Sequence, residues 1–162
     1  MPPALPEDLS EVIRYLESCY PREGCGVLLR RGEQGPWRVR PLRNVQDALH
    51  ASDPVRHPRT SRTAYSFDPC EWLAVLTEAD ARGEHVACVF HSHVDTEARF
   101  SDEDRRQAAP EGQLLIPGAA YLVISVHSGC VSAVGIFWWE CGEFRGHPVL
   151  PDSWKRQPTD FS

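Results

Sequence analysis

Two histidines, His91 and His93, are the first candidates for chemistry in this sequence. They follow an apolar run, residues 86–90, that has the length and β-branched content of a buried strand. Because side chains alternate along a strand, both imidazoles should point the same way where that strand ends. Asp104 is the best candidate for a third ligand, since a helix that begins at Ser101 would carry it on the first turn. Two imidazoles, one carboxylate and an open fourth position suit a catalytic zinc.

The same residues can also be interpreted without a metal. Paired histidines are more often solvated than metal-bound. The spacing Ser101-x-x-Asp104 is also that of a helix start, with Ser101 as the N-cap and Asp104 in the capping-box position. Spacing alone leaves both interpretations open.

The arrangement resembles the signature of the JAMM (MPN-plus) metalloproteases, the Mov34/MPN/PAD-1 group. The His-Ser-His triplet at 91–93 is followed by seven residues, then Ser101, two residues and Asp104. That family also has a glutamate upstream, in a Pro-x-Glu-x-Cys-Gly-like stretch. Residues 21–26 match this stretch and place the glutamate at Glu23. Two matches in the right order favour membership of the family, as a small prokaryotic-type member.

The resemblance extends, more weakly, from the first expected helix to about residue 137. One departure is Val94, which stands where the family usually has proline after the second histidine. That position is not a ligand, so the difference concerns the conformation of the loop.

The resemblance implies a role for each site residue. One zinc ion per chain would be held by His91, His93 and Asp104. Glu23 would be the general base, whereas without the family pattern it would be read as an exposed acid before a strand. Ser101 would donate a hydrogen bond to the oxyanion, a contribution of roughly 3 kcal/mol in comparable sites. Ser101 can act as N-cap, as oxyanion donor, or as both.

Composition bounds the class of protein. The 162 residues allow one domain, expected over 1–149, with a C-terminal tail over 150–162. The formal net charge of -6 disfavours nucleic acid or an anionic membrane as the main partner. The sequence has no apolar run of the ~18 residues that a membrane span needs, and its start lacks the pattern of a signal peptide. Six scattered cysteines without a Cys-x-x-Cys pair fit a cytoplasmic protein with reduced thiols and no cysteine on the metal.

The order of expected elements predicts an α/β (α+β) fold. Helices are expected over 6–19, 69–82 with Asp68 as N-cap, and 101–109. Strands are expected over 26–30, 37–45, 64–67, 85–91, 120–127, 130–140 and 144–149. Residues 46–63 should form a long loop or flap, which in the resembling family lies beside the substrate channel. Helices flanking a mixed or antiparallel sheet fit this pattern, and the resemblance narrows it to the MPN/JAMM domain, similar to the cytidine-deaminase-like sandwich.

The resemblance also implies a substrate. Members of the family cut peptide or isopeptide bonds at the C-terminal diglycine tail of ubiquitin or ubiquitin-like proteins. Small single-domain members resemble prokaryotic ones that process ubiquitin-like sulfur-carrier proteins. We therefore expect a zinc peptidase or isopeptidase with a carrier of that type as substrate and partner. In the 46–63 flap, His50 and His57 could meet this substrate.

Three other interpretations of the sequence compete with that of a JAMM-type peptidase. A metallo-β-lactamase-like site needs a further histidine where Thr96 stands. A zinc deaminase needs a second cysteine after Pro69-Cys70, which is absent. A non-catalytic MPN scaffold that only binds partners would lose ligands that this chain keeps.

Asp95 is either a hydrogen-bond partner of a ligating histidine or a solvated loop residue.

Overall fold

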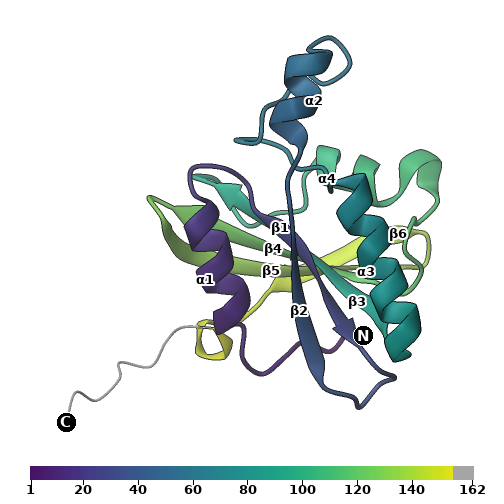
Figure 1. Ribbon diagram of the computed structural model, residues 1–162. Helices are drawn as coiled ribbons and strands as arrows, with labels where there is room; N and C mark the ends of the chain where they lie inside the picture. The colour runs from purple at the N-terminus through teal and green to yellow at the C-terminus, as the bar shows by residue number, and fades with distance from the viewer. Residues whose placement is uncertain (155–162) are drawn as a thin grey trace.

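One mixed sheet organises the protein, for which a computed structural model describes residues 1–154 (Figure 1). The six strands lie in the order β2-β1-β3-β4-β5-β6, with β3 and β4 parallel and the other neighbours antiparallel. The helices are α1 (Ser10–Cys19), α2 (Gln46–Ser52), α3 (Pro69–Arg82) and α4 (Asp102–Ala108), with 3-10 turns at Pro110–Gly112 and Pro151–Ser153. The strands are β1 (Cys25–Arg30), β2 (Trp37–Leu42), β3 (His85–Val94), β4 (Ala120–His127), β5 (Cys130–Glu140) and β6 (Glu143–Pro148).

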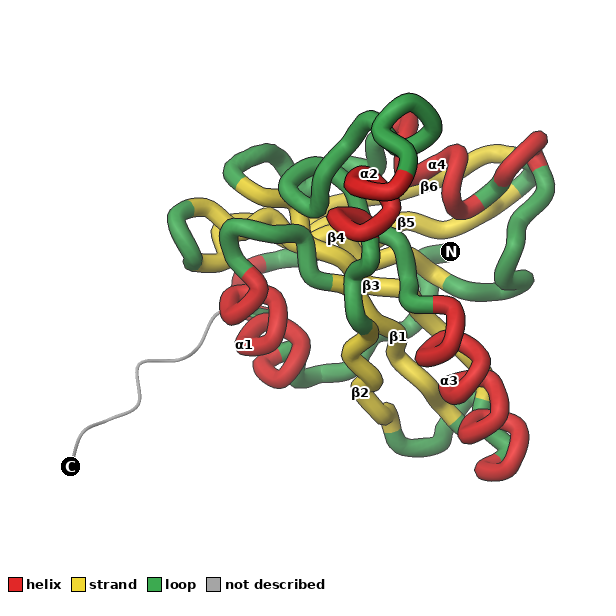
Figure 2. Tube along the Cα trace, turned by 45° about the horizontal axis from the view of Figure 1, so that its top comes forward, coloured by secondary structure: helices red, strands yellow, loops and turns green. Residues whose placement is uncertain are grey.

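The sheet separates two apolar cores. Side chains that alternate along β1 and β3 face opposite layers, so Leu28 and Phe90 pack with Val12 and Leu16 of α1. On the other face, the core joins the sheet to α3 and α4; its members include Val27, Val75, Val89, Ala108 and Val123. Figures 1 and 2 show α1 on one side and α3 on the other. This second face is the one that β3 shares with the candidate site.

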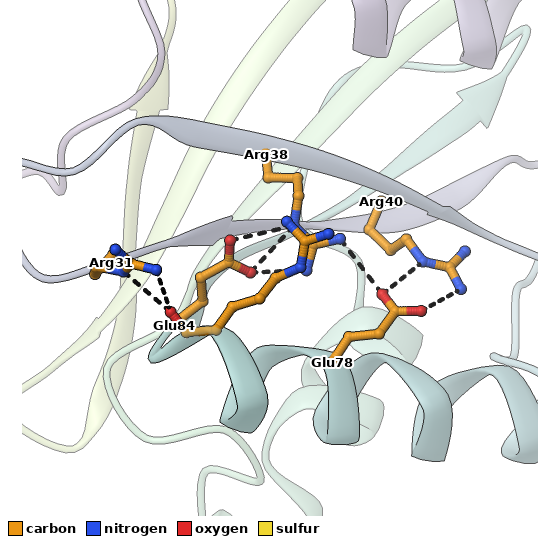
Figure 3. A network of polar contacts seen from close by, with 6 residues as sticks. Arg31, Arg38, Arg40, Glu78 and Glu84 are labelled. Atoms are coloured by element: carbon orange, nitrogen blue, oxygen red, sulfur yellow. Dashed lines mark hydrogen bonds and ion pairs between the residues drawn. The ribbon is translucent and has the colours of Figure 1, made fainter.

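Ion pairs attach α3 to the edge strand β2 (Figure 3). Arg38 contacts Glu84 at 2.7 Å and Glu78 at 3.4 Å, and Arg40 contacts Glu78 at 3.3 Å. Arg31 adds two hydrogen bonds to the last carbonyl of α3. These charged groups also cover one side of an edge strand, which otherwise invites pairing with another chain.

The start of the 46–63 segment differs from the prediction. It forms the helix α2 rather than a loop, so the prediction is wrong there. The helix has only seven residues and one large apolar side chain, Leu49, so it carries no periodic signal. It begins where the Gln46 N–H donates to the side-chain oxygen of Asn44, at 3.0 Å. Likewise, the strand predicted over 64–67 reduces to a single bridge between Asn44 and Phe67.

The other expected elements are present with shifted ends. α1 begins at Ser10 rather than at residue 6, β2 ends at Leu42, and β3 continues to Val94, so both histidines lie inside the strand. Within residues 1–154, no helix is both long and apolar enough to cross a membrane. Most of the expected tail, residues 155–162, lies outside the described residues. The Trp154 indole before it donates to the Val149 carbonyl at 3.1 Å.

Candidate active site

Strand β3 and helix α4 bring three candidate ligands together. The Nε2 atoms of His91 and His93 are 3.2 Å apart. One carboxylate oxygen of Asp104 lies 3.0 Å from Nε2 of His91, and the other lies 3.1 Å from Nε2 of His93. All three side chains are buried, and their ligand atoms lie within 4.8 Å of one another. The structure therefore assembles the predicted set at one point.

Hydrogen bonds orient two of these groups. Nδ1 of His93 lies 2.8 Å from the Glu97 carbonyl and donates to it, so in the neutral ring Nε2 carries the lone pair that a cation could bind. The Ser101 N–H donates to Asp104 at 2.9 Å, and the Ser101 hydroxyl accepts from the Asp104 N–H at 3.1 Å. This is a complete capping box. Asp104 is therefore both the helix cap and a candidate ligand, so the two readings left open by its spacing coexist.

The donor set fits zinc. Two imidazole nitrogens and a carboxylate that face one another at hydrogen-bonding distances are the N and O ligands of an open zinc site. Nδ1 of His91 is buried and has no hydrogen-bond partner within the described part of the chain. The ring is instead stacked against Tyr65, with centroids 4.5 Å apart. Orientation of His91 thus comes from packing, whereas orientation of His93 comes from a hydrogen bond.

The protonation states of His91 and Asp104 favour ligation. Burial lowers the pKa of His91, which keeps the ring neutral. Burial alone would raise the pKa of Asp104, but the two neighbouring imidazoles outweigh burial and hold this pKa well below its usual range. Burial would lower the pKa of His93, but its hydrogen bond to Asp104 and the charge of that carboxylate raise it. A neutral imidazole at His91 and an ionised Asp104 are forms that bind a cation.

Glu23 lies in the same cleft as His93 and Ser101. This cleft has a volume of about 170 Å³ and also touches the 59–63 segment and Arg99. The Glu23 side chain is only 6% exposed. Its burial raises its pKa to about 8; the charge of His93 opposes the rise and that of Asp104 adds to it. A carboxyl group with a pKa near neutrality can both accept and donate a proton.

Backbone hydrogen bonds hold Glu23 in place from three directions. Its N–H donates to the Ser61 carbonyl at 2.7 Å, and its carbonyl accepts from the Asn44 side chain at 2.9 Å. The N–H of the next residue, Gly24, donates to the Ser92 hydroxyl at 2.9 Å. The backbone N–H of Ser92 donates to the Gly24 carbonyl at 3.0 Å. Ser92 lies between the two histidines, so the candidate base and the candidate ligands are tied to one another.

Sequence reasoning did not find these supporting residues. Asn44, Ser61, Ser92 and Tyr65 act through partners far away in the sequence. Of these four residues, only Ser92 was marked in the sequence, by its position between the two histidines.

The structure selects one of the two interpretations of Asp95, that of an exposed loop residue, and gives the surroundings of His50 and His57. Asp95 accepts from the Tyr20 hydroxyl at 2.8 Å and the Ser128 N–H at 3.0 Å, rather than from an imidazole. Nδ1 of His50 hydrogen-bonds the His57 carbonyl at 2.7 Å, within the 46–63 segment. Neither of these histidines lines the cleft that contains Glu23.

Comparison with known proteins identifies the class. The model of the family described as prokaryotic homologs of the JAB domain matches residues 6–141, and the chain belongs to this family. The recognition of a JAMM/MPN-type protein is thereby confirmed, as is the α+β fold with a mixed sheet flanked by helices.

Individual relatives include one curated protein and two solved structures. A desampylase of Haloferax volcanii is 30% identical over 105 residues, which are 65% of this chain and 63% of the relative. The chain thus spans less than two thirds of that protein. A solution structure of a Desulfitobacterium hafniense protein is 26% identical, with a TM-score of 0.61, and covers 91% of this chain and 88% of its own. A Salinibacter ruber protein is 26% identical, with a TM-score of 0.54 and coverages of 90% and 88%.

Proposed function

We propose that this protein is a zinc-dependent peptidase or isopeptidase of the JAMM type. Its substrate would be an amide bond at the C-terminal diglycine tail of a ubiquitin-like protein of the sulfur-carrier type. The observation that carries the proposal is the convergence of His91, His93 and Asp104 beside a cleft that also holds Glu23. The family membership and the desampylase relative support hydrolysis of a ubiquitin-like protein conjugate.

The three converging side chains would hold the zinc ion, with the two Nε2 atoms and one carboxylate oxygen as ligands. Bound there, zinc supplies an acidified water molecule and polarises the substrate carbonyl. The Glu23 carboxylate takes the proton of the attacking water and later delivers it to the leaving nitrogen. Its pKa near 8 suits both transfers at neutral pH.

Ser101 would stabilise the oxyanion. Its hydroxyl oxygen already accepts from the Asp104 N–H, so the hydroxyl proton is free to be donated. Ser101 also lines the cleft with Glu23 and His93. A donor aimed at the carbonyl oxygen of the substrate would lower the barrier in the way of other oxyanion holes.

The decisive experiment compares zinc binding with turnover. A diglycine-tailed carrier with extra C-terminal residues is incubated with the zinc-loaded protein and followed by intact mass. Glu23→Gln should retain about one zinc per chain and the fold but abolish cleavage. His91→Ala and Asp104→Ala should lose zinc and activity together.

Each part of the proposal has its own contradicting result. Cleavage that survives Glu23→Gln excludes this residue as the base. Zinc binding without cleavage of any carrier excludes the substrate class. A folded protein that binds no zinc supports the non-catalytic MPN scaffold instead.

A further inference from the structure

Three arginines line the cleft that holds Glu23. Besides Glu23, His93 and Ser101, its lining includes Arg59, Arg62 and Arg99. The whole chain has a net charge of -6, so the three guanidinium groups oppose the overall balance. Such a concentration of cations in a small concave site attracts an anionic group.

The arginines of the 59–63 segment lie on the side of Glu23. The Glu23 N–H donates to the carbonyl of Ser61, which lies between Arg59 and Arg62 in the sequence, at 2.7 Å. The positive charge of Arg59 also acts on the Glu23 carboxyl group. In the proposed reaction, Glu23 delivers a proton to the leaving nitrogen. The leaving group must therefore lie near these two arginines.

The three guanidinium groups keep donors available. Arg62 pairs with Asp95 at 3.6 Å, and one nitrogen of Arg59 donates to the Thr63 carbonyl at 3.2 Å. Arg99 has no ion pair or hydrogen bond within residues 1–154 and is exposed at the mouth of the cleft. Since a guanidinium group has several donors in a fixed fork, each arginine can still bind a carboxylate.

We propose that Arg59, Arg62 and Arg99 form a subsite for the free carboxylate of the leaving group. This inference rests on the proposed function and specifies its substrate: an α-linked C-terminal residue, released as a free amino acid. In such a leaving group the carboxylate is one carbon atom away from the amine that accepts the proton. In a lysine isopeptide the amine lies at the end of the side chain, and the backbone carboxyl group is an amide without charge.

The size of the cleft agrees with a short leaving group. Its volume of about 170 Å³ leaves room for several water molecules. A single small residue fits this space together with its carboxylate.

The test uses two substrates that differ only in this charge. One carrier ends in Gly-Gly-Ala with a free carboxylate, and the other ends in Gly-Gly-alaninamide. The zinc-loaded protein should cleave the free acid with a kcat/KM about tenfold or more above that of the amide, as expected for hydrogen bonds between charged groups. A carrier joined to a lysine side chain should behave like the amide.

Variants of the arginines test whether the preference for the free acid over the amide comes from this subsite. Arg62→Gln and Arg99→Gln should each lower kcat/KM for the free acid about tenfold and leave the amide unchanged, whereas Arg59 is left in place in this comparison because its charge also acts on Glu23. Arg56→Gln is the matched control, since Arg56 is exposed in the same segment but lines a different cleft. It should leave both rates unchanged. Equal cleavage of the acid and the amide by the parent protein overturns the inference and leaves the proposed function intact.

A binding measurement separates the inference of a carboxylate subsite from the proposed function. The zinc-loaded Glu23→Gln protein should bind the free acid about tenfold more tightly than the amide in calorimetric titration, and adding Arg59→Gln should remove the difference. If no carrier is cleaved by the parent protein, the proposed function fails, and the titration still decides the inference. Equal affinity for the acid and the amide overturns it.

Discussion

Glu23 is 6% exposed, and burial raises the pKa of its carboxyl group from 4.5 to about 8. The folded protein therefore holds a proton that the unfolded chain has lost between these two values. Stability from this group is fully present below about pH 4.5 and is lost as the pH rises through about 8. The slope is about 1.4 kcal/mol per pH unit between them.

Replacing Glu23 by Gln should remove this pH dependence from the zinc-free protein. Denaturant unfolding of both proteins in chelator, at several pH values between 4.5 and 8.5, measures it. The parent protein should lose a few kcal/mol relative to Glu23→Gln across this interval. If the two stability curves run parallel, the carboxyl group of Glu23 is ionised in the folded state.

Ser101 combines a helix cap with a proposed oxyanion donor, and one substitution can separate the two. Glycine at an N-cap costs only a few tenths of a kcal/mol, yet it removes the hydroxyl group. Ser101→Gly should therefore lower kcat by about 10²-fold and leave the melting temperature nearly unchanged. Ser101→Thr, which keeps the hydroxyl, is the control. Unchanged turnover in Ser101→Gly would restrict Ser101 to capping.

The candidate ligands could be grouped from the sequence because their spacing is local. His91 and His93 lie on one strand, and Ser101 and Asp104 on one helix turn. Glu23 could be assigned only through the family resemblance, since nothing nearby in the sequence relates it to the histidines. The cleft arginines could not be assigned, because their common position depends on how the 59–63 segment folds back against Glu23.

At the scale of elements, the Asn44 side chain makes four hydrogen bonds in the connection between β2 and α2. Asn44 donates to the carbonyls of Glu23 and Ala64 and accepts from the N–H groups of Gln46 and Ser66, at 2.9 to 3.2 Å. A single amide thus joins the start of α2, the 64–66 segment and the candidate base. Its removal takes away four hydrogen bonds between partly buried groups, each with a net contribution of about 0.5–1 kcal/mol.

Asn44→Ala should therefore destabilise the protein by about 2–4 kcal/mol and lower kcat while zinc remains bound. Thermal unfolding, kinetics and metal content measure the three effects. The neighbouring variant Arg43→Ala, at an exposed side chain, should change none of them. A fully active Asn44→Ala protein would show that Glu23 keeps its position without this amide.

Elements with local signals were predictable and those held by distant contacts were not. The α3 helix begins at Asp68, whose carboxylate accepts from two N–H groups of the first turn, and ends at Gly83 in the left-handed conformation. Both residues mark the helix in the sequence. By contrast, α2 has little apolar surface of its own, and its segment is held by Asn44 and by two hydrogen bonds between Asp47 and Ser61.

At the scale of the whole molecule, the fold class followed from the order of elements, but the order of strands did not. β1 lies between β2 and β3 and so pairs with a strand distant in the sequence. Loop lengths and apolar patterns do not specify such a pairing.

Zinc should stabilise the entire protein, since its proposed ligands join the central strand to α4. A ligand at 100 times its Kd contributes about 2.7 kcal/mol, which corresponds to roughly 5–10 °C for a chain of this size. Thermal unfolding with zinc or with chelator measures the shift. His91→Ala should show no response, and magnesium, which prefers oxygen ligands, should have no effect on the parent. A zinc response that survives His91→Ala would place the metal elsewhere.

The capping box of α4 makes two backbone amides direct reporters of this site. The N–H groups of Ser101 and Asp104 are held by the Asp104 carboxylate and the Ser101 hydroxyl. Any cation that immobilises this carboxylate also immobilises the first turn of the helix. Hydrogen–deuterium exchange at these two positions should therefore slow on metal loading, which would let occupancy be followed without a substrate, a label or a spectroscopically active ion.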